Sequence, residues 1–210
     1  MTSTDPAATG TRRRRSADER RAEIADAARA LALEEGLSGV TLRAVAARVG
    51  VASGLVAHYE PSMDALIART FTRIVGDELD GLRALTAQAP DAVAAVRMLL
   101  GLLLEGTHDA VTRVWVQSWG LGGEVLGAAV RAAMDDWEGY LEQLVDAGVA
   151  AGRFRVVAGS RAVAVQMLGM IDGLNAHALV RWREPADRRA LMALSVEAML
   201  GLDRGALDER

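Results

Sequence analysis

The feature that most constrains the fold is a pair of short, helically patterned segments separated by one glycine and two small residues. In the first, Thr41 is a plausible N-cap for LRAVAARV, whose apolar residues fall on one helical face before Gly50 ends the segment. In the second, Ser53 can cap GLVAHY at 54–59. Two short helices joined by so tight a turn predict a helix-turn-helix unit.

A longer helix is predicted in front of this pair, over about 17–35. Ser16 and Glu19 form a capping box at its start, apolar residues recur at helical spacing along it, and Gly36 closes it. Residues 16–60 are therefore expected to form one three-helix domain.

Helical patterns continue to the end of the chain. Ser62 caps a segment that runs to about 87 with its apolar residues on one face, and the break at Ala89-Pro90-Asp91 ends it. Residues 153–157 are the one later stretch expected to be extended. The remaining helices are predicted over 91–105, 108–120, 123–151, 159–182 and 186–201.

Composition agrees with closely packed helices, because 51% of the residues are apolar, only 4% are aromatic and 40 are alanine. Cysteine is absent, which excludes disulfide frameworks, thiolate zinc sites, iron–sulfur clusters and a cysteine nucleophile. No apolar run approaches the roughly 18 residues that span a bilayer. Arg12 to Arg15 are not followed by the hydrophobic segment of a secretory signal, so we expect a cytoplasmic protein.

Charge is unevenly distributed along the chain, although the net charge is only −4. Residues 12–59 hold nine arginines and six acidic residues, whereas residues 61–210 hold 15 arginines and 20 acidic residues. A basic amino-terminal part on an acidic remainder is typical of a protein that meets phosphate at one end. An ordinary solvated charge pattern is the alternative explanation.

Patterns of enzyme active sites are missing from the sequence. The three histidines lie far apart, and there is neither a glycine-rich phosphate loop nor a nucleophile elbow. Asp135 and Asp136 are adjacent, so they point to different faces of a helix and do not form a carboxylate pair. We expect no catalytic residues, no metal site and no cofactor.

A family resemblance rests on residues 21–67, RAEIADAARALALEEGLSGVTLRAVAARVGVASGLVAHYEPSMDALI. In spacing, glycine positions and apolar residues this stretch resembles the DNA-binding domain of the TetR family of bacterial repressors. Within that family, SGLVAHY is similar to the branch that includes choline- and betaine-responsive repressors. The resemblance implies an all-α homodimer with an amino-terminal, three-helix helix-turn-helix DNA-binding domain and a larger carboxyl-terminal helical domain for ligand binding and dimerisation.

The function implied by this resemblance is a ligand-responsive transcriptional regulator. It would be a repressor that binds a palindromic, double-stranded DNA operator as a homodimer and leaves it when a small-molecule effector binds. We expect the parts to be a disordered basic arm at 1–15, the helix-turn-helix domain at 16–60, and the ligand-binding and dimerisation domain at 61–210, of which 61–88 is a linking helix.

Candidate DNA contacts share small size, a hydrogen-bonding group or a match to contact positions of the family. They are Thr41, Arg43, Ala52, Ser53, Gly54, Ala57, His58 and Tyr59. Three have simpler explanations, because Ser53 can be an N-cap, Tyr59 a core aromatic and His58 a structural residue. Arg12 to Arg15 form either an arm that reaches a minor groove or a basic tail with diffuse attraction only.

Two positions depart from the family pattern. Glu60 stands where the family usually has Phe, and Met63 where it usually has Lys. An acid beside DNA repels it, and the missing Lys removes a phosphate contact. These departures leave open a second function, a helical small-molecule-binding protein with weakened or lost operator recognition.

Dimerisation is expected through the last two helices, which in TetR-like proteins build a four-helix bundle between subunits. A monomer could also bury the same apolar stripes internally. Gly169 and Gly173 would permit close helix approach. The stripes contain Val163, Met167, Met170, Ile171, Leu174, Ala178, Leu191, Leu194, Ala198 and Met199.

A ligand pocket is expected within the carboxyl-terminal domain, where a few polar groups accompany aromatic and apolar side chains. Several of the candidates could instead be plain core residues. Stacking of a flat or cationic ligand on tryptophan is the hypothesis for this site. The candidates are Trp115, Gln117, Trp119, Met134, Trp137, Gln166, Met170, Asp172, Asn175 and His177.

Overall fold

The computed structural model describes residues 16–106 and 108–208, and the predicted arm at 1–15 lies outside them. Over the described residues the chain is built from helices alone, which confirms the all-α fold class. The elements are α1 (Ala17–Glu35), η1 (Leu37–Gly39, a 3-10 helix), α2 (Leu42–Val49), α3 (Ser53–Tyr59), α4 (Met63–Thr86), α5 (Ala92–Leu104), α6 (Asp109–Gly120), α7 (Glu124–Ala150), α8 (Ser160–Ala178) and α9 (Pro185–Leu200).

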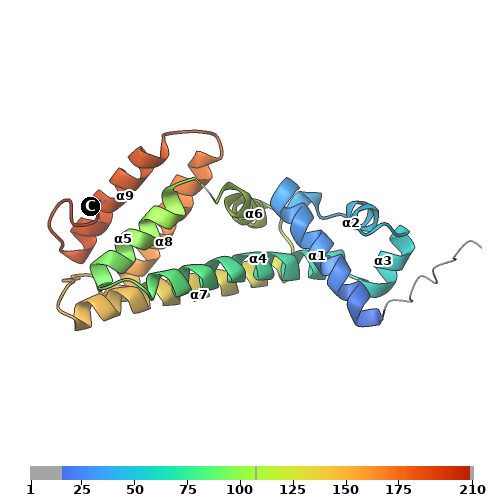
Figure 1. Cartoon of the computed structure of the whole chain (residues 1–210), viewed down its shortest axis with the longest axis horizontal. Helices are drawn as coiled ribbons and strands as arrows, with labels where there is room; N and C mark the ends of the chain where they lie inside the picture. The colour runs from blue at the N-terminus through green and yellow to red at the C-terminus, as the bar shows by residue number, and fades with distance from the viewer. Residues whose placement is uncertain (1–15, 107, 209–210) are drawn as a thin grey trace, which may run out of the picture.

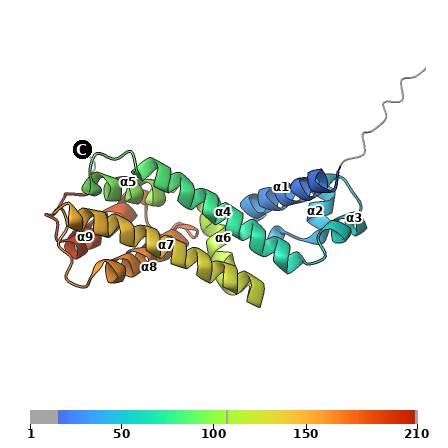
Figure 2. The same ribbon diagram turned by 90° about the horizontal axis from the view of Figure 1, so that it is seen from below.

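The helices form an elongated molecule with two ends of different character (Figure 1). One end holds α1, α2 and α3, and the other holds α5, α8 and α9. Helix α4 begins at the first end and extends along the second, and it packs against α7. Midway along the molecule, α6 contacts α1, α4, α7 and α8 (Figure 2). Helices α4 and α6 therefore contact helices of both ends.

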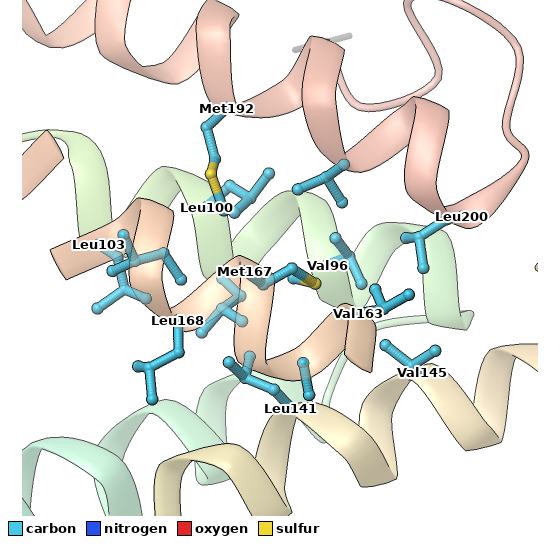
Figure 3. Packing of buried hydrophobic residues seen from close by; sticks show 14 of the residues in the cluster. Val96, Leu100, Leu103, Leu141, Val145, Val163, Met167, Leu168, Met192 and Leu200 are labelled. Atoms are coloured by element: carbon cyan, nitrogen blue, oxygen red, sulfur yellow. The ribbon is translucent and has the colours of Figure 1, made fainter. Parts of the chain in front are cut away.

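Two hydrophobic cores correspond to the two ends. The first surrounds Ile24 of α1 and Phe71 of α4, both fully buried, and it also takes in side chains from α6 and α7. In the second, side chains from α5, α7, α8 and α9 converge around Met167 (Figure 3). The rings of Phe71 and Trp115 meet edge to face with their centroids 5.0 Å apart, where the two cores adjoin. Burial of each large apolar side chain stabilises the fold by roughly 1.5–3 kcal/mol.

Helix starts agree closely with the sequence signals. The capping box of α1 is present, with Glu19 N–H donating to Ser16 Oγ at 3.1 Å and Ser16 N–H donating to the Glu19 carboxylate at 2.7 Å. Thr41, Ser62 and Asp91 cap α2, α4 and α5 in the same way. These contacts stabilise their helices because each satisfies a backbone N–H that has no partner within the helix.

Two predicted details are wrong. The α3 N-cap is Ala52 rather than Ser53, and no side chain caps this helix. Helix α8 ends at Ala178 rather than at 182, because the backbone turns there and φ is positive at Arg181 and Arg183. Residues 153–157 are not helical, as expected, and Arg155 N–H donates to Leu200 O at 2.8 Å. None of the described helices is both long and apolar enough to cross a membrane.

Candidate functional site

The turn between α2 and α3 is closed by backbone bonds that only a glycine makes easily. Gly50 adopts a left-handed conformation, with φ 73° and ψ 39°. It allows Val51 N–H to donate to Ala46 O at 3.0 Å, which is a common way to end a helix. Val56, fully buried, then fixes α3 against the first core. The sequence thus holds the two short helices at one fixed angle.

Most of the predicted DNA contacts lie on the exposed surface of this unit. Ser53 and Tyr59 are half-buried. Arg43 is exposed, and no ion pair involves it in the described part of the chain. The exposed candidates are Thr41, Arg43, Ala52, Gly54, Ala57 and His58.

The hydroxyl groups of Thr41 and Ser53 differ in whether they cap a helix. Thr41 Oγ1 accepts a bond of 3.2 Å from Ala44 N–H, so the hydroxyl caps α2 and keeps its hydrogen available for a phosphate oxygen. Ser53 is the first residue of α3 and caps nothing, which leaves its hydroxyl unused in helix capping.

His58 and Tyr59 form the end of α3 that packs on α1. Their rings meet edge to face with centroids 5.1 Å apart, and the Arg21 guanidinium lies 5.9 Å from the centre of the Tyr59 ring. Tyr59 also packs against the first core. The structural explanation for Tyr59 is therefore correct, and its partial exposure leaves its role at DNA a prediction.

Glu60 does not face outward, which corrects the expectation that its charge would repel DNA. The residue is buried, and its carboxylate forms an ion pair with Arg69 of α4. Glu60 comes one helical turn after buried Val56 and so falls on the inner face. Met63, the first residue of α4, is half-buried against the first core. The main reason for expecting lost operator recognition is thereby removed.

A cavity lies between α4, α6, α7 and α8 in the other half of the molecule. It is narrow, because the space open to the centre of a water molecule is about 30 Å³, enough for about two waters. Aromatic rings, aliphatic side chains and a few polar groups surround it. The lining consists of Glu78, Leu103, Thr112, Trp115, Val116, Trp119, Met134, Trp137, Leu168, Ile171, Asp172 and Asn175.

Two carboxylates give this cavity its electrostatic character. Burial, together with the smaller effect of the nearby Glu78 charge, raises the pKa of Asp172 to about 6. The Glu78 carboxylate lies 3.2 Å from His108 Nδ1 and accepts a bond of 3.4 Å from the Trp115 indole N–H. Its hydrogen bond to His108 raises the pKa of that imidazole. A positive charge in the cavity would therefore relieve the repulsion between the two carboxylates.

The structure brings six of the ten predicted pocket residues to the cavity and leaves four elsewhere. Those that line it are Trp115, Trp119, Met134, Trp137, Asp172 and Asn175. Gln166 and His177 are exposed on α8, and His177 packs on the Trp182 ring. Met170 packs on the second core. Gln117 points away from the cavity, because helical periodicity turns it toward α1 and η1.

Sequence reasoning missed Glu78, although a signal for it exists. Glu78 falls in phase with Phe71, Ile74 and Leu82, all buried, so the apolar stripe of α4 carries one acidic residue on its inner face. A carboxylate at such a position is rare without a partner or a function. The other residues missed at the cavity are Leu103, Thr112, Val116, Leu168 and Ile171.

Contacts on the opposite face of α6 join it to the three-helix end. Gln117 Oε1 accepts from Ser38 N–H at 3.1 Å, and the Arg113 guanidinium donates to Glu34 O at 3.2 Å. Glu34 belongs to the last turn of α1, whose carbonyls have no partner within the helix. Helix α6 thus lines the cavity with one face and holds the end of α1 with the other.

Comparison with known proteins assigns a family to the amino-terminal residues. Residues 24–70 match the model described as bacterial regulatory proteins, tetR family. The HTH-type transcriptional regulator BetI of Burkholderia thailandensis is 32% identical over 103 residues, which cover 48% of this chain and 53% of the relative. BetI of Paraburkholderia phymatum is 31% identical over 106 residues, with the same coverage. The match spans about half the length of these curated relatives.

Solved structures extend the likeness of fold to nearly the whole chain. A putative transcriptional regulator from Saccharomonospora viridis, in complex with choline, has a TM-score of 0.75 at 22% identity, covering 86% of this chain and 96% of that one. A TetR transcription regulator from Haloarcula marismortui has a TM-score of 0.74 at 20% identity, covering 87% and 99%. These relatives are described as regulators, not enzymes. The amino-terminal residues of this chain thus match the tetR family model and are similar to BetI, and nearly the whole chain is similar in fold to solved transcriptional regulators.

Proposed function

We propose that the chain is a ligand-responsive transcriptional repressor that binds a palindromic operator as a homodimer. In this proposal residues 16–60 contact DNA, residues 61–210 bind the effector and the second subunit, and an organic cation in the cavity releases the protein from DNA. The family match over residues 24–70 supports the DNA-binding part. The exposed Arg43 and Thr41 hydroxyl on α2 are suited to phosphate.

One observation carries the link between ligand and DNA. Helices α4 and α6, which bring Glu78 and Trp115 to the cavity, also pack on the three-helix end. The cavity is narrow, so in this proposal an organic ligand moves these helices apart when it binds. Such a movement changes the spacing of two α3 helices in a dimer and lowers operator affinity. A coupling free energy of about 1–3 kcal/mol is enough for regulation.

An organic cation is the effector class that suits the lining. Asp172 and Glu78 supply negative charge, and the faces of Trp115 and Trp119 can hold a cation by cation–π attraction. The indole N–H of Trp137 is buried and has no hydrogen-bond partner among the described residues. A ligand oxygen would satisfy it, so a cation that also carries an oxygen fits best. The choline in the Saccharomonospora viridis neighbour agrees with this class.

The dimer surface we propose consists of exposed apolar and small residues of α8 and α9 together with the half-buried Gly173. It differs from the predicted stripes, because Val163, Met167 and Ile171 are buried within their own chain. A side chain added at Gly169 or Gly173 would meet nothing within 4 Å. We call this surface the outer stripe; it comprises Val165, Gly169, Gly173, Leu191, Leu194 and Ala198.

Binding experiments on the full chain test the proposal. Duplexes are selected from random DNA with the purified protein, and their affinity is measured by fluorescence anisotropy with and without choline. We expect choline to lower DNA affinity and to change tryptophan fluorescence, and its uncharged analogue 3,3-dimethylbutanol to do neither. Asp172→Asn should weaken the effect of choline on DNA affinity. Trp137→Phe should also weaken the effect of choline, but it should leave unchanged the effect of tetramethylammonium, which has no oxygen. Failure to select any duplex would contradict the proposed function.

A further inference from the structure

The outer face of α3 presents carbon atoms where a base-reading helix often presents hydrogen-bonding groups. Val56 points inward, so helical periodicity turns Gly54 and His58 outward and places Leu55 and Ala57 on the two flanks. His58 supplies the only side-chain hydrogen-bonding group among these four outward and flanking residues. Sequence readout by this face must therefore depend largely on apolar contact.

Leu55 is the largest apolar group on that face and lies outside both hydrophobic cores. Its side chain is 37% exposed. Next to it, Gly54 has open space where a Cβ would stand, so the helix backbone can approach a surface closely. An exposed leucine alone would need no explanation. Here it stands on the second helix of the helix-turn-helix unit, inside the segment that matches the family model.

We propose that Leu55 reads the 5-methyl group of a thymine in the major groove, and that each operator half-site has a thymine at that position. This inference rests on the proposed function, because it requires α3 to lie in the groove. Thymine is the one base whose major-groove edge carries a methyl group, and leucine contacts it without any hydrogen bond. Cytosine offers an amino donor at the same edge that Leu55 cannot bond. The discrimination at this base pair thus comes from one methyl group.

The test removes the thymine methyl group and the Leu55 side chain separately and then together. A duplex selected by the wild-type protein is remade with single thymines replaced by 2′-deoxyuridine, which differs only by the missing methyl. For the wild type, one replacement in each half-site should weaken binding about 15-fold, which is about fourfold for each of the two methyl groups removed. For Leu55→Ala, which loses the contact in both subunits, the intact duplex should bind at least about 15-fold more weakly, and the same replacement should have no further effect.

Control variants separate a lost contact from a damaged fold. Leu85 of α4 is also exposed, at 44%, and lies at the end of α4 remote from α3, so Leu85→Ala should keep the full wild-type response to deoxyuridine. Leu55→Met retains an apolar side chain and should keep the dependence on the methyl group. Thermal unfolding should be nearly the same for all three variants.

Two results would overturn the inference in distinguishable ways. If the protein binds its duplex and deoxyuridine costs Leu55→Ala as much as it costs the wild type, Leu55 does not read the methyl group while the proposed function stands. If no duplex is bound at all, the inference and the proposed function fail together.

Discussion

Gln117 of α6 accepts a hydrogen bond of 3.1 Å at its side-chain oxygen from the backbone N–H of Ser38, 79 residues earlier in the chain. Ser38 belongs to η1, the short helix that leads from α1 into α2. On the other face of α6, Trp115 and Trp119 line the cavity. A shift of α6 that makes room for a ligand must therefore pull on the segment that leads into the DNA-binding helices.

Removal of this bond should uncouple the cavity from DNA binding. We expect Gln117→Ala to lower the free energy of unfolding by about 1 kcal/mol, the usual value for one hydrogen bond. Choline should still change tryptophan fluorescence, but its effect on DNA affinity should shrink, because α6 no longer holds η1. The measurement is DNA affinity with and without choline. Gln88→Ala, at an exposed residue just after the end of α4, is the control and should respond as the wild type does.

A substitution at Gly36 should damage the same junction for two separable reasons. Gly36 has φ 84° and ψ 176°, a conformation essentially confined to glycine, and a Cβ there would lie 2.4 Å from Gln117 Oε1. Gly36→Ala should therefore cost about 1–3 kcal/mol from the backbone alone, with the clash added. In Gly36→Ala/Gln117→Ala the clash disappears and the backbone cost remains. The double variant should therefore lose less unfolding free energy than the sum of the losses in the two single variants. Strict additivity in chemical denaturation would show that the two residues do not interact.

The pKa of Asp172, raised to about 6 by burial and by Glu78, makes stability and ligand binding depend on pH in opposite ways. Between about pH 4 and pH 6 the folded protein binds more protons at this site than the unfolded chain, so the free energy of unfolding falls as the pH rises. Above pH 6 the free energy of unfolding is lower than at pH 4 by a constant amount, on the order of 3 kcal/mol. Cation binding needs the ionised carboxylate, so choline affinity should rise as the pH increases through 6 and level off above it.

Asp172→Asn separates the contribution of this residue from that of His108, whose pKa is also raised. The variant should be more stable than the wild type at pH 7.5 by about 1–3 kcal/mol, and it should bind choline more weakly there. Calorimetric titration and chemical denaturation at pH 5 and pH 7.5 measure both effects. Asp146→Asn, an exposed acid on α7, should change neither. A variant that lost choline binding without gaining stability would argue that Asp172 is not a buried, destabilised carboxylate.

The Glu60–Arg69 ion pair joins the end of α3 to α4. Its loss should lower the free energy of unfolding and should not increase DNA affinity. Glu60→Gln leaves Arg69 without its partner, but the Arg69 side chain is 57% exposed and can bind water. The expected cost is therefore modest, about 1 kcal/mol. DNA affinity should not increase, because the carboxylate is turned away from the exposed face. A clear increase in affinity, with a steeper salt dependence, would mean that Glu60 faces the phosphates after all.

Local signals in the sequence were enough to predict where most of the helices begin and end. Ser16, Thr41 and Ser62 cap helices that the sequence places within a residue or two, because a cap depends on contacts within one turn. The end of α8 was missed, since no glycine or proline interrupts the pattern between Gly173 and Pro185. There the backbone turn depends on positive φ at Arg181 and Arg183, which side-chain patterns do not predict.

The candidate sites were less predictable, because their partners are distant in sequence. Glu60 could have been placed from its spacing to Val56, and Glu78 from its phase within α4. Gln117 could not, because its contact with Ser38 depends on how α6 packs against α1. Its position between two tryptophans of the cavity made it resemble a ligand contact, whereas helical periodicity directs it to the opposite face.

Gly169 and Gly173 give a direct test of the outer stripe of α8 and α9. Alone in solution, the chain has open space at both positions, so replacement of glycine by a helix-forming residue should stabilise the monomer by about 0.5–1 kcal/mol per site. If two copies of α8 pack closely there, a large side chain separates them. Gly169→Leu/Gly173→Leu should therefore keep full helicity and become monomeric in sedimentation velocity, with weaker DNA binding. Gly81→Leu, at an equally open position on α4, should remain dimeric, and a double variant that also remained dimeric would assign the subunit contact to another surface.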